Sequence, residues 1–243
     1  CSLDLLDDIE DGDQTPIVRQ LGAARVLNVS TALLLLSQKM LRSLADFGIS
    51  ADRIVTLMAL TQEAVAIAII GQHEDIVGEQ QEIDLYTTED CIRIARGKAG
   101  ALLRLACTIG CMFVNTDQHI QQLFAELGEL LGIAHQFDND SHDLYTILHD
   151  QETETVKTDI AHQKKTLPLV LAAQIRASQH TAPNISQRDE TDPQHALLAS
   201  YDEGIIAAWG ISLLYRERAQ DCLRAIEVRQ PVSGELRLLL GFA

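Results

Sequence analysis

The sequence has few of the residues that interrupt or end helices, with 5 prolines and 14 glycines among 243 residues. Aromatic residues make up only 4% of it, whereas alanine, leucine, isoleucine, glutamine and glutamate recur at intervals of three and four. No segment alternates polar and apolar residues for long enough to predict a sheet. This composition predicts an all-α protein, and the hydrophobic content of 47% can supply a substantial core.

Basic residues are scarce relative to acidic ones, with 19 Lys and Arg against 35 Asp and Glu and a formal net charge of −16. Proteins that bind nucleic acids neutralise phosphates with clusters of Lys and Arg, which this sequence does not contain. The composition therefore argues against a nucleic-acid partner. An anionic substrate would need additional cations, such as a bound metal ion.

The sequence also has no unbroken apolar run that approaches the roughly 18 residues of a membrane span, and no signal-peptide pattern at its start. Its five cysteines are an odd number and have no His or Cys neighbours at zinc-site spacing. Reduced thiols are favoured over a disulfide or metal role. We therefore expect a cytoplasmic protein without a transmembrane segment.

Apolar residues at intervals of three and four predict long helices over most of the chain. The first is expected to end at Gly48, the second to begin at the cap Ser50, and the third to begin at Thr87 or Thr88. Polar stretches at 150–163 and 178–194 are expected to be loops, with two or three helices after the second. Before the second loop, the predicted helices cover residues 16–47, 50–71, 87–110, 115–148 and 166–177.

Acidic side chains gather in the segment "DDIED". Asp7 and Asp11 are four residues apart and Asp8 and Asp11 three, so all three share one face of a helix, and Asp4 extends the row by a turn. Like charges at this spacing repel each other, and a purely structural helix gains nothing from them. One interpretation is a solvated acidic face, and the other is a site for a divalent cation.

A second cluster, "NDSHD", repeats this geometry in an apolar helix far along the chain, with Asn139, Asp140 and Asp143. Two such clusters in one helical protein suggest carboxylates that face each other across a cavity. Oxygen ligands of this kind suit Mg2+, which commonly binds one or two carboxylates together with substrate phosphates. Three lysines could help to neutralise a diphosphate there: Lys98, Lys164 and Lys165.

Five motifs follow one another in the order "DDIED", "GQHED", "RGKAGAL", "LGIAHQFDND" and "TDIAHQKKTLPLVLA". In this order and spacing the sequence resembles the trans-isoprenyl diphosphate synthase, or polyprenyl synthetase, family over nearly its whole length. The resemblance implies a single-domain helical bundle of the isoprenoid synthase type, over residues 1–243, around a central apolar cavity. The family's N-terminal helices, which bind isopentenyl diphosphate, have no counterpart in this sequence. We expect either a fragment or an enzyme that works without that site.

The resemblance implies roles for ten residues. The expected Mg2+ ligands are Asp7, Asp8, Asp11, Asn139, Asp140 and Asp143. Lys98 and Lys164 are expected to bind the diphosphate, and Gln72 and Gln136 to be polar residues of the cavity. A catalytic part is expected for Asp7, Asp8, Asp11, Lys98, Gln136 and Lys164. The implied reaction is Mg2+-assisted ionisation of an allylic prenyl diphosphate, attack by an acceptor double bond, and loss of a proton.

Several positions depart from the family pattern. The arginine pair expected shortly after the first motif is reduced to Arg19, which lies further along the chain, so the resemblance implies one anchor fewer for the allylic diphosphate. Asn139 replaces a carboxylate and is a weaker Mg2+ ligand. Ala99 stands where a threonine is usual, and His135 where a phenylalanine is usual.

Three histidines, His135, His142 and His149, lie seven residues apart. That spacing separates them by about 10 Å along a helix, too far for two of them to hold one ion. We favour ordinary structural roles for the set, although His135 or His142 could line the cavity.

The acceptor stays open. Isopentenyl diphosphate, as in a prenyl diphosphate synthase, is the simplest choice. The departures also resemble a divergent branch that prenylates a tryptophan of a peptide pheromone, and a non-catalytic partner subunit is a third alternative. The family implies a homodimer. Leu3 and Ser2 stand where bulky aromatics close the cavity floor in the family, so the floor is predicted not to stop a prenyl chain at fifteen carbons.

Overall fold

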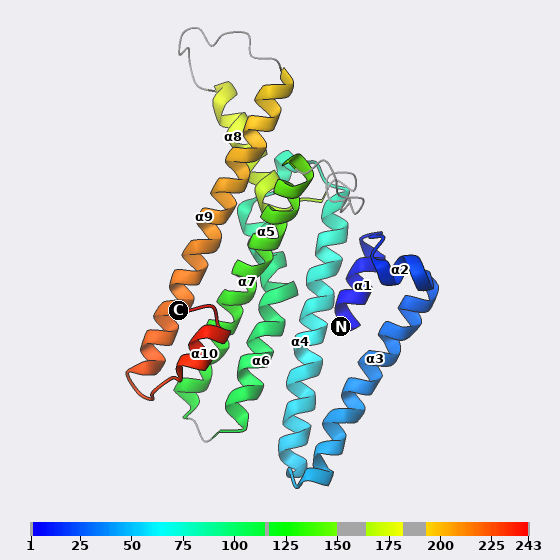
Figure 1. Cartoon of the computed structure of the whole chain (residues 1–243), viewed down its shortest axis with the longest axis vertical. Helices are drawn as coiled ribbons and strands as arrows, with labels where there is room; N and C mark the ends of the chain where they lie inside the picture. The colour runs from blue at the N-terminus through cyan, green and yellow to red at the C-terminus, as the bar shows by residue number, and fades with distance from the viewer. Residues whose placement is uncertain (1, 115–116, 150–163, 182–192, 243) are drawn as a thin grey trace.

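The protein is a bundle of helices (Figure 1). The structure is a computed structural model and describes residues 2–114, 117–149, 164–181 and 193–242. No strand occurs in these ranges, and the predicted all-α class is confirmed. The elements are α1 (Ser2–Glu10), α2 (Pro16–Leu21), α3 (Ala23–Ser43), η1 (Leu44–Phe47), α4 (Ala51–Glu79), η2 (Ile83–Leu85), α5 (Thr88–Ala95), η3 (Arg96–Gly100), α6 (Ala101–Met112), α7 (Gln118–His149), α8 (Leu167–Thr181), α9 (Pro193–Glu227) and α10 (Gly234–Leu239).

The main core forms along α7, which packs between α6 and α9 (Figure 1). Phe137, Leu127 and Ile133 of α7 are completely buried, because its apolar residues recur on faces that both neighbours cover. Ser212 Oγ of α9 donates a hydrogen bond to the carbonyl of Ala134 at 3.1 Å. This packing fixes the position of the second acidic cluster, which lies on α7.

Asp7 and Asp8 of the first acidic cluster lie on α1, which packs against α3, and Asp11 follows α1 directly. Ser2 Oγ donates to the carbonyl of Ser30 at 2.9 Å, and Ser30 Oγ donates to the carbonyl of Ser2 at 2.8 Å. Ser30 is fully buried. This reciprocal pair attaches the start of α1 to α3, because each hydroxyl satisfies a carbonyl of the other helix.

The predicted helix over 16–47 is wrong as a single element. Gly22 has a φ of 81°, a conformation that glycine adopts without steric cost, and it separates α2 from α3. Gly48, also at 81°, ends the segment as predicted. The second helix does begin after Ser50, but its predicted end at Gly71 is wrong, because α4 continues to Glu79. Gly71 instead serves a close helix contact.

The predicted helix over 87–110 contains a π-helical turn, η3, between α5 and α6. Its start at Thr87 is confirmed by a capping box: Thr87 Oγ1 accepts from Asp90 N at 3.1 Å, and Asp90 Oδ2 accepts from Thr87 N at 3.0 Å. Arg93 joins this cap by donating to Asp90 at 2.7 Å and to Glu74 of α4 at 2.9 Å. These bonds attach the start of α5 to α4.

An Asp90→Asn substitution is expected to lower the free energy of unfolding by about 1 kcal/mol at neutral pH, the usual value of a helix cap. Hydrogen bonds from Thr87 and Arg93 lower the pKa of Asp90 below its usual 3.8. The stabilisation is therefore present above pH 3.8 and is lost as the pH falls through the depressed pKa of the folded state. Urea unfolding at several pH values measures this.

Glu89→Gln is the matched control, because Glu89 is an exposed residue of the same first turn. It should change stability by much less. A penalty for Asp90→Asn that stays constant into acid would contradict the assignment of the carboxylate.

Two predicted loops fall largely outside the described residues. Residues 150–163 lie entirely outside them, as does Cys1. In the predicted loop over 178–194, α8 extends to Thr181 and α9 already begins at Pro193. The two helices that follow, α9 and α10, agree with the predicted number.

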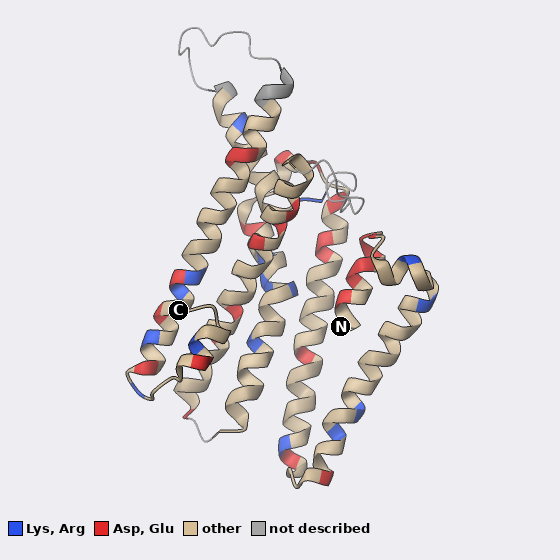
Figure 2. Cartoon of the chain, viewed as in Figure 1, with Lys and Arg blue, Asp and Glu red and all other residues tan. Residues whose placement is uncertain are grey.

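Large apolar side chains are exposed along three helices. Figure 2 shows few charged residues over much of α3 and α4, and their exposed apolar side chains include Leu35, Met40, Val55 and Ile70. By length and composition, α4 and residues 197–227 of α9 could each cross a membrane, a test that core helices of soluble proteins also pass. Neither helix contains a long unbroken apolar run, so the sequence pattern did not reveal this property. The absence of a membrane segment stays a prediction.

Candidate active site

A cavity of about 450 Å³ opens between α1, α4, η3, α7 and the segment that leads into α8. The structure brings all ten predicted site residues to its wall, although they come from positions as distant as 7 and 164. They are Asp7, Asp8, Asp11, Gln72, Lys98, Gln136, Asn139, Asp140, Asp143 and Lys164. Their roles in binding and catalysis remain predictions.

The first acidic cluster is engaged by polar partners. Asp11 is buried, accepts from Gln72 Nε2 at 3.2 Å and pairs with Lys164 Nζ. Asp8 Oδ2 accepts from Thr15 Oγ1 at 3.2 Å, just before α2 begins. Asp8 of α1 and Asp11, which follows α1 directly, therefore both line the cavity and contact polar partners there.

Lys98 of η3 is a second cation at the cavity wall. Its Nζ lies 2.8 Å from Asp75 Oδ2 and 3.2 Å from Asp7 Oδ1. Burial alone would lower the pKa of Lys98, but the charges of Asp75 and Asp7 outweigh it, so that the net pKa lies above the usual 10.5. Lys98 is therefore positively charged at neutral pH.

Asp75 is a site residue that sequence reasoning missed. It lies within "GQHED", the motif from which only Gln72 was selected. The signal was its spacing, because residues three apart share one face of a helix. Asp75 holds Lys98 at the cavity wall.

The second acidic cluster lines the cavity from α7. Asp140 Oδ1 accepts from Gln136 Nε2 at 2.9 Å, one turn earlier on the same helix. Asn139 Nδ2 lies 3.3 Å from His135 Nε2, and both residues face the cavity. The amide of Gln136 therefore orients the carboxylate of Asp140, as expected for a residue that supports a ligand.

The three aligned histidines have different surroundings. His135 lines the cavity, whereas His149 Nε2 lies 2.9 Å from Asp202 of α9 and its ring is 4.5 Å from that of Tyr145.

The four described cysteines are free thiols, and Cys91 is at the cavity wall. Burial raises the pKa of Cys107 and Cys222 to about 11, so these thiols are protonated at neutral pH.

The donor set of the cavity fits Mg2+. Asp8, Asp140 and Asp143 present hard oxygen ligands from α1 and α7. Among the described residues, no group of three or more His, Cys, Asp or Glu side chains is arranged so that it could hold a metal ion by itself. Sites completed by substrate phosphates require only one or two carboxylates per ion, and the two clusters provide these.

A further observation supports a ligand in this region. Oε1 of Gln72 is buried and has no hydrogen-bond partner among the described residues. A buried acceptor without a partner costs roughly 1–3 kcal/mol. Burial also raises the pKa of Asp7 above its usual 3.8, a cost that the charge of Lys98 only partly offsets.

The profile of the polyprenyl synthetase family matches residues 2–201. This chain belongs to that family. It is 31% identical over 192 residues to geranylgeranyl diphosphate synthase of Mycobacterium tuberculosis, covering 73% of this chain and 50% of that protein. It is 28% identical over 167 residues to the tryptophan prenyltransferase ComQ of Bacillus spizizenii, covering 68% of this chain and 52% of that protein. The chain thus spans about half the length of these two curated relatives.

Solved structures share the fold. A geranylgeranyl pyrophosphate synthase from Lactobacillus brevis aligns over 99% of this polyprenyl synthetase family chain and 73% of its own, with a TM-score of 0.75 at 18% identity. A decaprenyl diphosphate synthase from Rhodobacter capsulatus aligns over 98% and 72%, with a TM-score of 0.73 at 20% identity. The predicted isoprenoid synthase bundle is confirmed.

Proposed function

We propose that this chain is an Mg2+-dependent prenyltransferase that uses an allylic prenyl diphosphate, most simply a prenyl diphosphate synthase. The observation that carries the proposal is the convergence of two acidic clusters and two lysines on one cavity. Its relatives' names include both prenyl diphosphate synthases and a tryptophan prenyltransferase. All of them describe enzymes that make or transfer prenyl groups.

The cavity is lined by both polar and apolar residues, and in this proposal the polar ones bind the diphosphate and the apolar ones contact the prenyl chain. Lys98 and Lys164 would bind the diphosphate oxygens, exchanging part of their contact with the carboxylates for contact with substrate. Leu6, Ile69 and Leu102 also line the cavity and would contact the prenyl chain. An apolar wall excludes water from the reacting carbon, which prevents simple hydrolysis.

The reaction begins when the allylic carbon–oxygen bond breaks and the diphosphate leaves with the electron pair. Bound Mg2+ would neutralise the negative charge that grows on the leaving diphosphate. The acceptor double bond then supplies electrons to the allylic carbocation, so that a carbon–carbon bond forms and the positive charge moves to the acceptor. A proton then passes from the carbon next to this new cation to the released diphosphate, and a new double bond forms. Lys98, Lys164 and the oriented Gln136 would stabilise the departing charge.

The ligands of Mg2+ in this proposal are Asp7, Asp8, Asp11, Asn139, Asp140 and Asp143. Asp7 and Asp11 pair with lysines, so metal binding would require these pairs to loosen. This exchange keeps the carboxylates compensated before the metal arrives.

The deciding experiment incubates the protein with Mg2+, a labelled allylic diphosphate and isopentenyl diphosphate. Release of diphosphate and an elongated prenyl product are expected. Transfer to a tryptophan-containing peptide instead would support the peptide-prenylating alternative. Absence of metal-dependent diphosphate binding by folded protein would leave only the non-catalytic partner subunit.

Product length is a separate prediction. Leu3 lines the cavity, and the Ser2 side chain is engaged with Ser30 of α3, so neither position carries a bulky aromatic ring. We expect products longer than fifteen carbons, measured by chromatography of the dephosphorylated prenols. Only shorter products from an active preparation would contradict an open floor.

We also propose a homodimer and a cytoplasmic location, with no nucleic-acid partner. Exposed apolar side chains on α3 and α4, such as Leu35 and Val55, support a contact between two copies of the chain at this surface. Only 28% of the apolar stretch of α4 is buried within the chain. Sedimentation of the purified protein tests the dimer.

A further inference from the structure

Two consecutive lysines precede α8, and their side chains have different partners. We call residues Lys164 to Thr166 the lysine strap. Both lysines are buried, at 8% and 6% exposure. Lys164 Nζ pairs with Asp11 of the first acidic cluster, whereas Lys165 Nζ donates to the carbonyl of Glu79 at 3.2 Å. The strap lies before α8 and outside any helix, and its two lysines contact different partners.

The partner of Lys165 is the last residue of α4. The final carbonyls of a helix lack intrahelical partners and carry partial negative charge, which a nearby ammonium stabilises. Burial lowers the pKa of Lys165, and the charge of Glu79 opposes this change. A buried ammonium is tolerated when such an acceptor is present. Lys165 therefore connects the strap to the end of α4.

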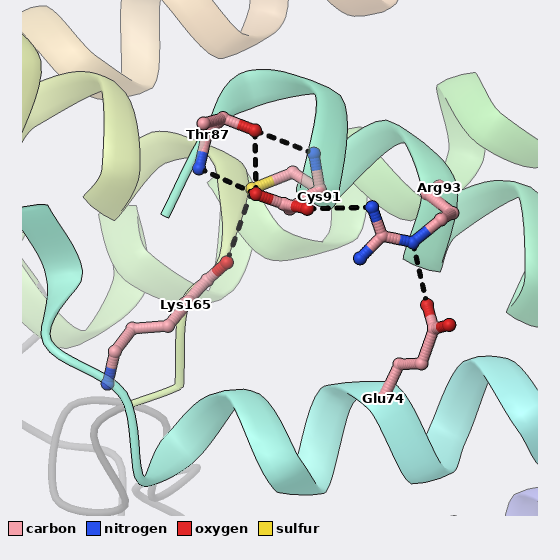
Figure 3. A network of polar contacts seen from close by, with 6 residues as sticks. Glu74, Thr87, Cys91, Arg93 and Lys165 are labelled. Atoms are coloured by element: carbon pink, nitrogen blue, oxygen red, sulfur yellow. Dashed lines mark hydrogen bonds and ion pairs between the residues drawn. The ribbon is translucent and has the colours of Figure 1, made fainter. Parts of the chain in front are cut away.

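A second connection reaches the strap from α5. Cys91 is 5% exposed, and its Sγ donates to the carbonyl of Lys165 at 3.3 Å (Figure 3). The start of α5 is itself fixed by the Thr87 cap and by the ion pair between Arg93 and Glu74 of α4 (Figure 3). The strap is thus attached to two helices that are also attached to each other.

We propose that Lys165 and Cys91 are positioning residues that act through Lys164. By fixing the backbone of the strap, they hold the ammonium of Lys164 beside Asp11, where a diphosphate would find a cation already in place. This inference rests on the proposed function for its ligand. It assigns the two neighbouring lysines different tasks, with Lys164 binding the anion and Lys165 capping α4.

The test is a double-mutant cycle of Lys164→Met and Lys165→Met, with inorganic diphosphate and Mg2+ as the probe in titration calorimetry. Lys164→Met should weaken binding by roughly 10- to 100-fold, the value of a charge-assisted hydrogen bond. Lys165→Met alone should weaken diphosphate binding about 5-fold, because Lys165 affects the anion only through a displacement of Lys164. The double variant should bind no more weakly than Lys164→Met.

Additive losses in the cycle would overturn the proposal, because they would assign Lys165 its own contact with the anion. Unchanged affinity in Lys165→Met would overturn it as well. Lys165→Arg keeps a donor for Glu79 and should recover most of the affinity. Lys39→Met, on the exposed surface of α3, removes one positive charge without touching the cavity and should bind as the unmodified protein does.

Cys91 is tested in the same way. Cys91→Ala removes the donor and should weaken diphosphate binding about 2- to 3-fold, whereas Cys91→Ser keeps a donor and should recover it. Equal losses in both variants would assign Cys91 to packing and overturn its positioning role.

A ligand-free measurement separates this inference from the proposed function. Lys164 is 10% exposed at its side chain, so an amine-acylating reagent should label it slowly, as followed by peptide mass spectrometry. Labelling should accelerate about 5-fold in Lys165→Met, in line with the loss of binding. Unchanged labelling would overturn the inference, whereas absent diphosphate binding in the unmodified protein would contradict the proposed function.

Discussion

An Asp140→Asn variant is expected to lose at least about 100-fold in kcat/KM for the allylic diphosphate, because removing one charged metal ligand costs several kcal/mol of transition-state stabilisation. Asn has the same shape and can still accept the hydrogen bond that Gln136 donates to Asp140 at 2.9 Å. The fold should therefore be unaffected. The lost property is the negative charge that Mg2+ requires.

Asp138→Asn is the matched control on the same helix. Asp138 pairs with Arg216 of α9 and does not line the cavity. It should change activity by less than about 2-fold and stability by at most about 1 kcal/mol, as for a partly exposed ion pair. Steady-state kinetics across Mg2+ concentrations measures both variants. Equal activity in the two would exclude Asp140 as a metal ligand.

A Gly71→Ala variant is expected to lose about 1–3 kcal/mol of stability and to raise KM for the diphosphate substrate about 10-fold. A Cβ on Gly71 would lie 2.9 Å from Lys98 N and 3.0 Å from the carbonyl carbon of Gly97. Both are backbone atoms of the π-helical turn η3, which must move as a unit. The turn carries Lys98, and Gln72 follows Gly71 directly, so the displacement reaches the cavity.

Gly110→Ala is the control for glycine replacement in a helix, because nothing lies within 4 Å of its Cβ position. Alanine there should be neutral or should stabilise α6 by up to about 1 kcal/mol. Urea unfolding and substrate saturation curves measure the two effects separately. Wild-type stability and KM in Gly71→Ala would contradict a tight crossing of α4 and η3.

Much of the site was predictable because its residues repeat at helical spacing. Asp7, Asp8 and Asp11 share one helix face wherever that helix lies, and Asn139, Asp140 and Asp143 do the same on α7. The cap at Thr87 and the stop at Gly48 were also predictable, since each depends on local backbone chemistry.

Other features depend on contacts between distant segments. Gly71 was interpreted as a helix end, but its lack of a side chain permits the approach of Gly97, which lies far along the chain. Lys165 was grouped with Lys164 as a diphosphate cation, and only the folded chain reveals that its ammonium also donates to the carbonyl of Glu79. Asp75 was passed over because only its contact with Lys98 reveals its role.

The sequence by itself determined the helical class, the two acidic clusters and the family, because these follow from local periodicity, composition and motif order. Tertiary structure alone decided which charges meet. Lys98 faces Asp7 and Asp75, while Lys164 faces Asp11. The physical reason is range: helix periodicity acts over a few residues, whereas the energy of a buried ion pair depends on distances that only helix packing sets.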